Sequence, residues 1–216
     1  MSDVQIEPVP GLPAYLPPGE NILWQGRPQW RSMARRTFHV RAVGLYLALA
    51  VVARGFSLAW NGADLTASLW ASLTVTPVAA TGVGVLLLLA WAHSRTTLYT
   101  LTDRRIVLRY GVAFPMAVNV PFKIVGSASL KLYQDGTGEI PLNLTGTDKM
   151  SYLHLWPHAR PWRFSRAEPM LRAVPHASDV AALVAEALQA DQGRSPRTRR
   201  SPERAPVHAG GLAWAE

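Results

Sequence analysis

The sequence predicts a membrane α+β protein, in which a two-helix transmembrane hairpin precedes an antiparallel β domain with a C-terminal capping helix. Three observations support this fold class. Residues 40–60 and 67–92 are long and apolar enough to cross a bilayer. Residues 97–144 then alternate apolar and polar side chains in short segments, as half-buried strands do. Apolar residues recur at helical spacing after Ser178.

The composition narrows the classes of function. The chain has 216 residues and no cysteine, which excludes disulfides, thiolate metal sites and cysteine nucleophiles. Its net charge of +8 favours an anionic partner, either phospholipid or nucleic acid. Most arginines bracket the apolar stretches, so an anionic phospholipid surface is the favoured partner and we expect no nucleic acid.

Residues 1–37 are expected to form a cytoplasmic N-terminal arm. The segment EPVPGLPAYLPPGENILWQGRPQW is rich in proline, which excludes a long helix, and Trp24 and Trp30 offer anchors for one short ordered segment. The start of the chain lacks a basic stretch followed by an apolar core, so it is not expected to be a signal peptide.

Residues 38–93 are expected to form the transmembrane hairpin, with spans at about 40–60 and 69–92. Arginines precede the first span and follow the second, whereas the connection NGADLT has none. The positive-inside rule therefore places both termini in the cytoplasm of a multi-pass protein of the bacterial inner (cytoplasmic or intracytoplasmic) membrane. Arg54 interrupts the first span, and its guanidinium is expected to reach the head groups or Asp64.

Residues 95–190 are expected to form the cytoplasmic β domain. TLYTLTDRRIVLRYG is typical of a β-hairpin, and Asp135-Gly136 predicts the turn of another. The segments AVNVPF, KMSYLHLW and PWRFS are interpreted as further strands. A helix from Asp179 to Ala190, with Ser178 as N-cap, would close the sheet. Residues 191–216 lack periodicity and are expected to be disordered.

Two blocks resemble a known family. These are EPVPGLPAYLPPGENILWQGRPQW at residues 7–30 and YLHLWPHARPWRFSRAEPMLRAVP at residues 152–175, joined by the two spans and TLYTLTDRR. They are similar to the PuhB family of photosynthetic complex (reaction-centre) assembly proteins of purple bacteria. More broadly, the spans with the hairpin core LYTLTDRR resemble bacterial membrane proteins with a pleckstrin-homology (PH)-like domain. The resemblance reaches about residue 190.

The resemblance implies an assembly factor for the photosynthetic reaction centre and, indirectly, its light-harvesting antenna. The family is regarded neither as a subunit of the finished complex nor as an enzyme. Its expected partners are reaction-centre polypeptides or other assembly factors, with a homodimer left open. The alternative is a lipid-sensing or membrane-organising PH-like protein without a photosynthetic role. An enzyme would need a convergent polar pocket, and the sequence shows no catalytic motif.

Two histidine positions raise the question of a ligand. His154 and His158 have the spacing of a zinc pair on a helix, but their neighbours alternate as on a strand and Pro157 lies between them. We therefore expect a structural or interface role and no metal. His93, at the end of the second span, is a weak candidate to ligate a bacteriochlorophyll magnesium. The ordinary interpretation, an interfacial histidine, is favoured, and no cofactor is expected.

The remaining candidates are contact residues. Aromatic residues dominate interface hot spots, so the candidates for partner contact are Trp24, Trp30, His154, Trp156, His158 and Trp162. A core role is the alternative for about half of these four tryptophans, and for those of residues 152–162 in particular, because Tyr152, His154 and Trp156 alternate on one expected strand face. Lipid-contact candidates are Arg35, Arg36, Arg104 and Arg105, of which the last two lie on the expected hairpin turn.

Overall fold

The computed structural model describes residues 12, 16–145, 151–161 and 167–194, without the side chains of residues 153, 154 and 194. Its elements in chain order are β1 (Ile22–Gly26), α1 (Trp30–Arg36), α2 (Val40–Trp60), α3 (Leu65–Thr96), β2 (Leu98–Thr102), β3 (Arg105–Tyr110), β4 (Met116–Pro121), the 3₁₀ turn η1 (Phe122–Ile124), β5 (Val125–Ala128), β6 (Lys131–Leu132), β7 (Gly138–Leu144), α4 (Tyr152–Leu155), β8 (Met170–Val174) and α5 (Ala177–Arg194).

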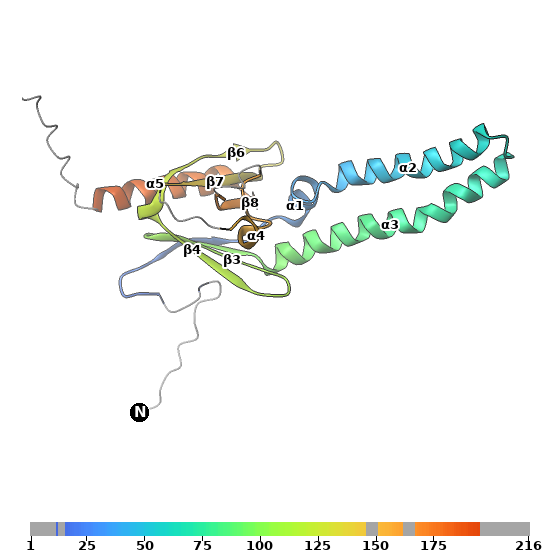
Figure 1. Cartoon of the computed structure of the whole chain (residues 1–216). Helices are drawn as coiled ribbons and strands as arrows, with labels where there is room; N and C mark the ends of the chain where they lie inside the picture. Colours follow the sequence, from blue (N-terminus) through green and yellow to red (C-terminus); the bar gives the residue numbers. More distant parts are fainter. Residues whose placement is uncertain (1–11, 13–15, 146–150, 162–166, 195–216) are drawn as a thin grey trace, which may run out of the picture.

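The helices α2 and α3 form the expected hairpin and project from the β domain (Figure 1). Both are long and apolar enough to cross a membrane, and most of their apolar side chains are exposed. The carboxylate of Asp64 caps α3 by accepting a hydrogen bond from the backbone N–H of Ala67 at 3.0 Å. Arg54 is exposed on α2.

The first sheet has the order β1-β2-β3-β4 and is antiparallel throughout. The hairpin predicted at residues 97–111 is confirmed as β2 and β3. The N-terminal arm, however, contributes more than the isolated ordered segment expected, because β1 pairs with β2 from Ile22 to Gly26 and forms an edge of this sheet. The β domain therefore includes residues on both sides of the hairpin in sequence.

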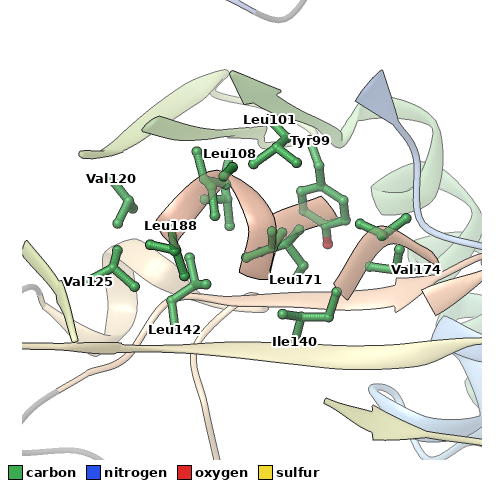
Figure 2. Packing of buried hydrophobic residues seen from close by; sticks show 14 of the residues in the cluster. Tyr99, Leu101, Leu108, Val120, Val125, Ile140, Leu142, Leu171, Val174 and Leu188 are labelled. Carbon is green, nitrogen blue, oxygen red and sulfur yellow. The ribbon is translucent and has the colours of Figure 1, made fainter. Parts of the chain in front are cut away.

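The second sheet is built around β7, which pairs with β5, β6 and β8. Figure 2 shows side chains of the first sheet, such as Leu101 and Leu108, facing Ile140 and Leu142 across the core. The helix α5 presents Val180, Val184 and Leu188 to the same cluster, as its sequence periodicity predicted.

A second apolar cluster joins the hairpin to the β domain. It contains Met33 of α1, Phe38 in the link to α2, Ala90 of α3 and Ala173 of β8. The backbone N–H of Gln29 also donates to the carbonyl of Ala173 at 2.8 Å. The contact between the β domain and the hairpin therefore consists of packed side chains, and the two parts are not joined by a free linker alone.

One expected strand is a helix in the structure, and another lies mostly outside the described residues. KMSYLHLW was interpreted as a strand, but Tyr152–Leu155 forms the short helix α4, so its alternation does not reflect a sheet face. PWRFS lies mostly outside the described residues. The tail expected to be disordered from residue 191 starts within a helix, because α5 continues to Arg194, and the tail from residue 195 lies outside the described part of the chain.

Candidate interaction surface at the junction of hairpin and β domain

Trp156 is the sequence candidate that lies at this junction with an exposed side chain. It directly follows α4, and about half of its side chain, 48%, is exposed. Its ring packs edge-on against Phe38 at 6.1 Å and against His93 at 5.8 Å between centroids. These partners precede α2 and end α3, so Trp156 lies where the hairpin leaves the β domain.

His93 is buried beneath Trp156 and Phe38. Its Nδ1 has no hydrogen-bond partner among the described residues. The sequence made this histidine a candidate pigment ligand. In the structure its ring contacts two aromatic rings, and the centroid of Phe38 lies 5.7 Å from its own. The aromatic group of Phe38, His93 and Trp156 is therefore a packed contact with one exposed member.

His158 is a core residue, and its assignment to a partner interface is wrong. It is fully buried, with Nδ1 2.9 Å from the Tyr99 hydroxyl and Nε2 3.2 Å from the Thr97 hydroxyl. Burial lowers the pKa of His158 to about 3, with smaller contributions from the charges of Arg172 and His93. Burial likewise raises the pKa of Tyr99. His158 is thus neutral and has both nitrogens engaged, which leaves neither for a metal.

The other aromatic candidates are dispersed. Trp24 on β1 is partly buried against the main core, which fits the core alternative better than a contact surface. Trp30 begins α1, is 40% exposed and has the Arg31 guanidinium 5.6 Å from its ring centroid. The side chain of His154 and all of Trp162 lie outside the described residues.

The four arginines expected to contact lipid fall into two groups. Arg35 and Arg36 end α1, beside the start of α2, and share the carboxylate of Asp135 at 3.6 and 3.1 Å. The hydroxyl of Thr137 and, to a smaller extent, Arg36 lower the pKa of Asp135 to about 2. This pair of arginines is at the end of the β domain from which α2 and α3 project (Figure 1).

Arg104 and Arg105 are at the opposite end, away from α2 and α3, which does not favour the expected contact with lipid. The strand β2 leads away from α3 for five residues, roughly 16 Å, before the turn that holds both arginines. Arg105 forms two bonds of 2.7 and 2.8 Å to Glu20, which is 7% exposed, and Arg104 donates to the carbonyl of Gly19. These arginines fix residues 19–20 to the β domain.

Two features at the junction had no sequence signal of their own. Arg172 on β8 is only 7% exposed, and the other residues of this strand are apolar. In the sequence, a single arginine in such a strand is typical of an exposed position at a sheet edge, so its burial had no signal. Phe114 is 81% exposed in the β3–β4 turn. The register of β2 with β3 pairs Leu98 with Arg109, which places this turn beside the end of α3 (Figure 1).

Comparison with known proteins agrees with this architecture. The family model described as "Bacterial PH domain" matches residues 40–188. An "Uncharacterized 23.7 kDa protein in puhA 5'region" of Rhodobacter capsulatus is 40% identical over 190 residues, which cover 87% of this chain and 88% of that protein. No solved structure matches the chain at a significant level. With a family match over more than half its length, the chain belongs to the bacterial PH domain family.

Proposed function

We propose that the protein is an assembly factor for the photosynthetic reaction centre, and indirectly for the light-harvesting antenna, of the PuhB type. The observation that carries the proposal is the relative from a photosynthetic bacterium, which is named for its position in the puhA 5′ region and aligns with nearly the whole chain. The likeness of residues 7–30 and 152–175 to PuhB supports the same assignment.

The proposed mechanism is protein contact at the cytoplasmic membrane surface, without an enzymatic step. The junction supports it, because Trp156 offers an exposed aromatic face beside the point where α2 and α3 meet the β domain. A tryptophan held by packed neighbours loses little conformational freedom on binding, which is typical of interface hot spots. Reaction-centre polypeptides entering the membrane, or other assembly factors, would meet the protein here.

The proposed topology is a multi-pass inner-membrane protein with both termini in the cytoplasm. It is supported by the length and apolar surface of α2 and α3 and by the arginines that flank them on the side of the β domain. The short connection at residues 61–64 would face the periplasm, and the β domain would rest on the cytoplasmic surface.

Deletion of the gene in a photosynthetic host tests the function. Reaction-centre content, measured from the absorption of its bacteriochlorophylls in isolated membranes, is expected to fall and to recover when the gene is restored. Unchanged content in the deletion strain would contradict the proposal. It would favour the second candidate, a lipid-sensing or membrane-organising PH-like protein, which the arginines at the membrane end of the domain also support.

A further inference from the structure

A polar pocket of about 310 Å³ opens at the junction, beside the aromatic group of Phe38, His93 and Trp156. Three parts of the chain that are distant in sequence form it: the link between α1 and α2, the β6–β7 hairpin, and the segment from α4 to β8. The residues that carry the argument are Arg36, His39, Lys131, Tyr133, Glu139 and Arg172.

Arg172 is the most informative residue of this lining. Its side chain is more than nine-tenths buried, and its Nη2 donates to the carbonyl of Ala159 at 2.9 Å. Its Nε has no hydrogen-bond partner among the described residues. A buried guanidinium with an unused donor is costly, so the negative charge of a ligand in the pocket would stabilise it.

The other charges of the pocket also favour an anion. Arg36 and Lys131 lie over the ring of Tyr133, at 3.4 and 5.4 Å from its centroid. With Arg172, they give the lining three cations against the one carboxylate of Glu139. Asp135 pairs with Arg36 from outside the lining, but it also pairs with Arg35, so the region keeps an excess of positive charge.

The position of the pocket matches the level of lipid head groups. His39, in its wall, is the N-cap residue of α2, the first helix long enough to cross the membrane. The His39 side chain makes no capping hydrogen bond. The N–H groups of a first helical turn lack partners within the helix, and the helix dipole favours negative charge there. An anion in the pocket would therefore lie close to the start of the span.

We propose that this pocket binds the phosphate of an anionic phospholipid, with Lys131 and Arg36 as its cationic contacts and the buried charge of Arg172 behind them. The acyl chains of such a lipid would extend along the apolar surface of α2 and α3. The site is distinct from the β2–β3 turn, whose arginines pair with Glu20 and the carbonyl of Gly19. The inference depends on the membrane placement of the hairpin, but not on a role in photosynthesis.

Binding by the purified full-length protein in a neutral detergent tests the proposal. The probes are dioctanoyl-phosphatidylglycerol, dioctanoyl-phosphatidylcholine and inorganic phosphate, each titrated by calorimetry. The anionic lipid is expected to bind saturably and at least about fivefold more tightly than the zwitterionic one. Its one net negative charge adds about 1 kcal/mol of attraction to the cations of the pocket, which corresponds to this factor. Inorganic phosphate is expected to bind more weakly, because it lacks the chains that would contact the hairpin.

Variants of Lys131 and Lys123 provide a matched pair. Lys131→Gln removes an exposed charge from the pocket and is expected to weaken phosphatidylglycerol binding about fivefold. Lys123→Gln removes an exposed charge from η1, close to the turn of Arg104, and is expected to leave the affinity unchanged. Arg172→Gln is expected to weaken binding about tenfold or more, since it removes a buried positive charge from the lining, where screening by water is weak.

Three results would overturn the proposal. The first is the same phosphatidylglycerol affinity for Lys131→Gln and Lys123→Gln. The second is equal affinity for the anionic and zwitterionic lipids. The third is inorganic phosphate binding as tightly as phosphatidylglycerol, which would assign the pocket to a free anion instead of a lipid. Should Arg172→Gln fail to fold because the bond to Ala159 is lost, the lysine pair still decides the question.

Discussion

The hydroxyl of Tyr99 lies 2.9 Å from Nδ1 of His158, and the hydroxyl of Thr97 lies 3.2 Å from the other ring nitrogen. Both partners come from the point where α3 passes into β2, whereas His158 comes from the segment after α4. The rings of Tyr99 and Tyr110 enclose the imidazole at centroid distances of 5.6 and 4.9 Å. This buried contact connects the end of the hairpin to the segment between α4 and β8.

The first prediction is that mild acid destabilises the fold through His158. Its folded pKa of about 3 is below the unfolded value of about 6.5, so the unfolded chain binds the proton first as the pH falls. Stability from this group is complete above about pH 6.5 and is lost progressively down to about pH 3. Between pH 7 and pH 5 the free energy of unfolding should fall by about 2 kcal/mol.

Denaturant unfolding of the full-length protein in detergent, followed by tryptophan fluorescence at several pH values, measures this loss. His158→Gln should lower stability at pH 7 and flatten its dependence on pH between 5 and 6.5. The exposed His176 serves as the control, because His176→Gln should keep the wild-type slope. A His158→Gln protein with an unchanged slope would show that other groups govern the acid response.

The second prediction concerns the ion pair between Glu20 and Arg105. Glu20→Gln leaves a partly buried guanidinium without its carboxylate, and we expect it to lower the free energy of unfolding by about 2 kcal/mol or more. It should also make the peptide bonds around residues 16–26 easier to cleave in limited proteolysis. Arg104→Gln, which loses one long bond to the carbonyl of Gly19, should cost less than about 1 kcal/mol. Equal effects of the two variants would contradict the assigned roles.

The third prediction is that Phe114 contacts the membrane. Because the chain contains no cysteine, Phe114→Cys allows a single nitroxide label in the β3–β4 turn, and Lys123→Cys provides a label at the other end of the domain. In vesicles, we expect the label at 114 to be more accessible to oxygen than to a water-soluble nickel chelate, with the reverse at 123. Equal accessibility at both positions would place the turn in water.

The fourth prediction is the topology of the hairpin. A reporter that is active only in the periplasm should be active when fused after Gly62, in the connection between α2 and α3. Fusion after Gly111 should be inactive, since this residue follows β3 in the domain that we propose to be cytoplasmic. Activity at Gly111 would overturn the hairpin orientation.

The spans, the first β-hairpin and the capping helix were predictable because each follows from a local pattern. Residues 40–60 are apolar over a bilayer thickness, and the alternation around Asp103 has the period of a strand. By contrast, β1 pairs with a strand more than seventy residues away, and no local pattern in a proline-rich segment specifies such a partner. The same limit applies to Glu20 and Arg105, which are 85 residues apart.

The site was less predictable than the fold. The alternation of Tyr152, His154 and Trp156 fits a strand face, yet Tyr152–Leu155 is a short helix, so periodicity over so few residues is a weak guide to the element. His158 had been grouped with the exposed aromatics because it adjoins Trp156, yet Pro157 between them separates an exposed ring from a buried one. The cationic pocket depends on Arg36, Lys131 and Arg172, and only the tertiary fold brings these residues together.

The fifth prediction concerns the surface around Trp156. Trp156→Ala should reduce reaction-centre assembly in a deletion strain that carries the variant gene, because truncating an interface aromatic costs about 2 kcal/mol or more of binding. Trp60→Ala, at the distal end of α2 and 80% exposed, is the matched control and should support wild-type assembly. The abundance of both variants in the membrane, measured by immunoblot, separates lost contact from lost protein.

Reaction-centre absorption in membranes of the Trp156→Ala strain, normalised to the amount of this protein, is the most direct measurement of the central claim. The account predicts a clear fall relative to wild type and to Trp60→Ala at equal abundance. Full assembly by an abundant Trp156→Ala protein would contradict the claim that the protein acts through the exposed surface at the junction of its hairpin and its β domain.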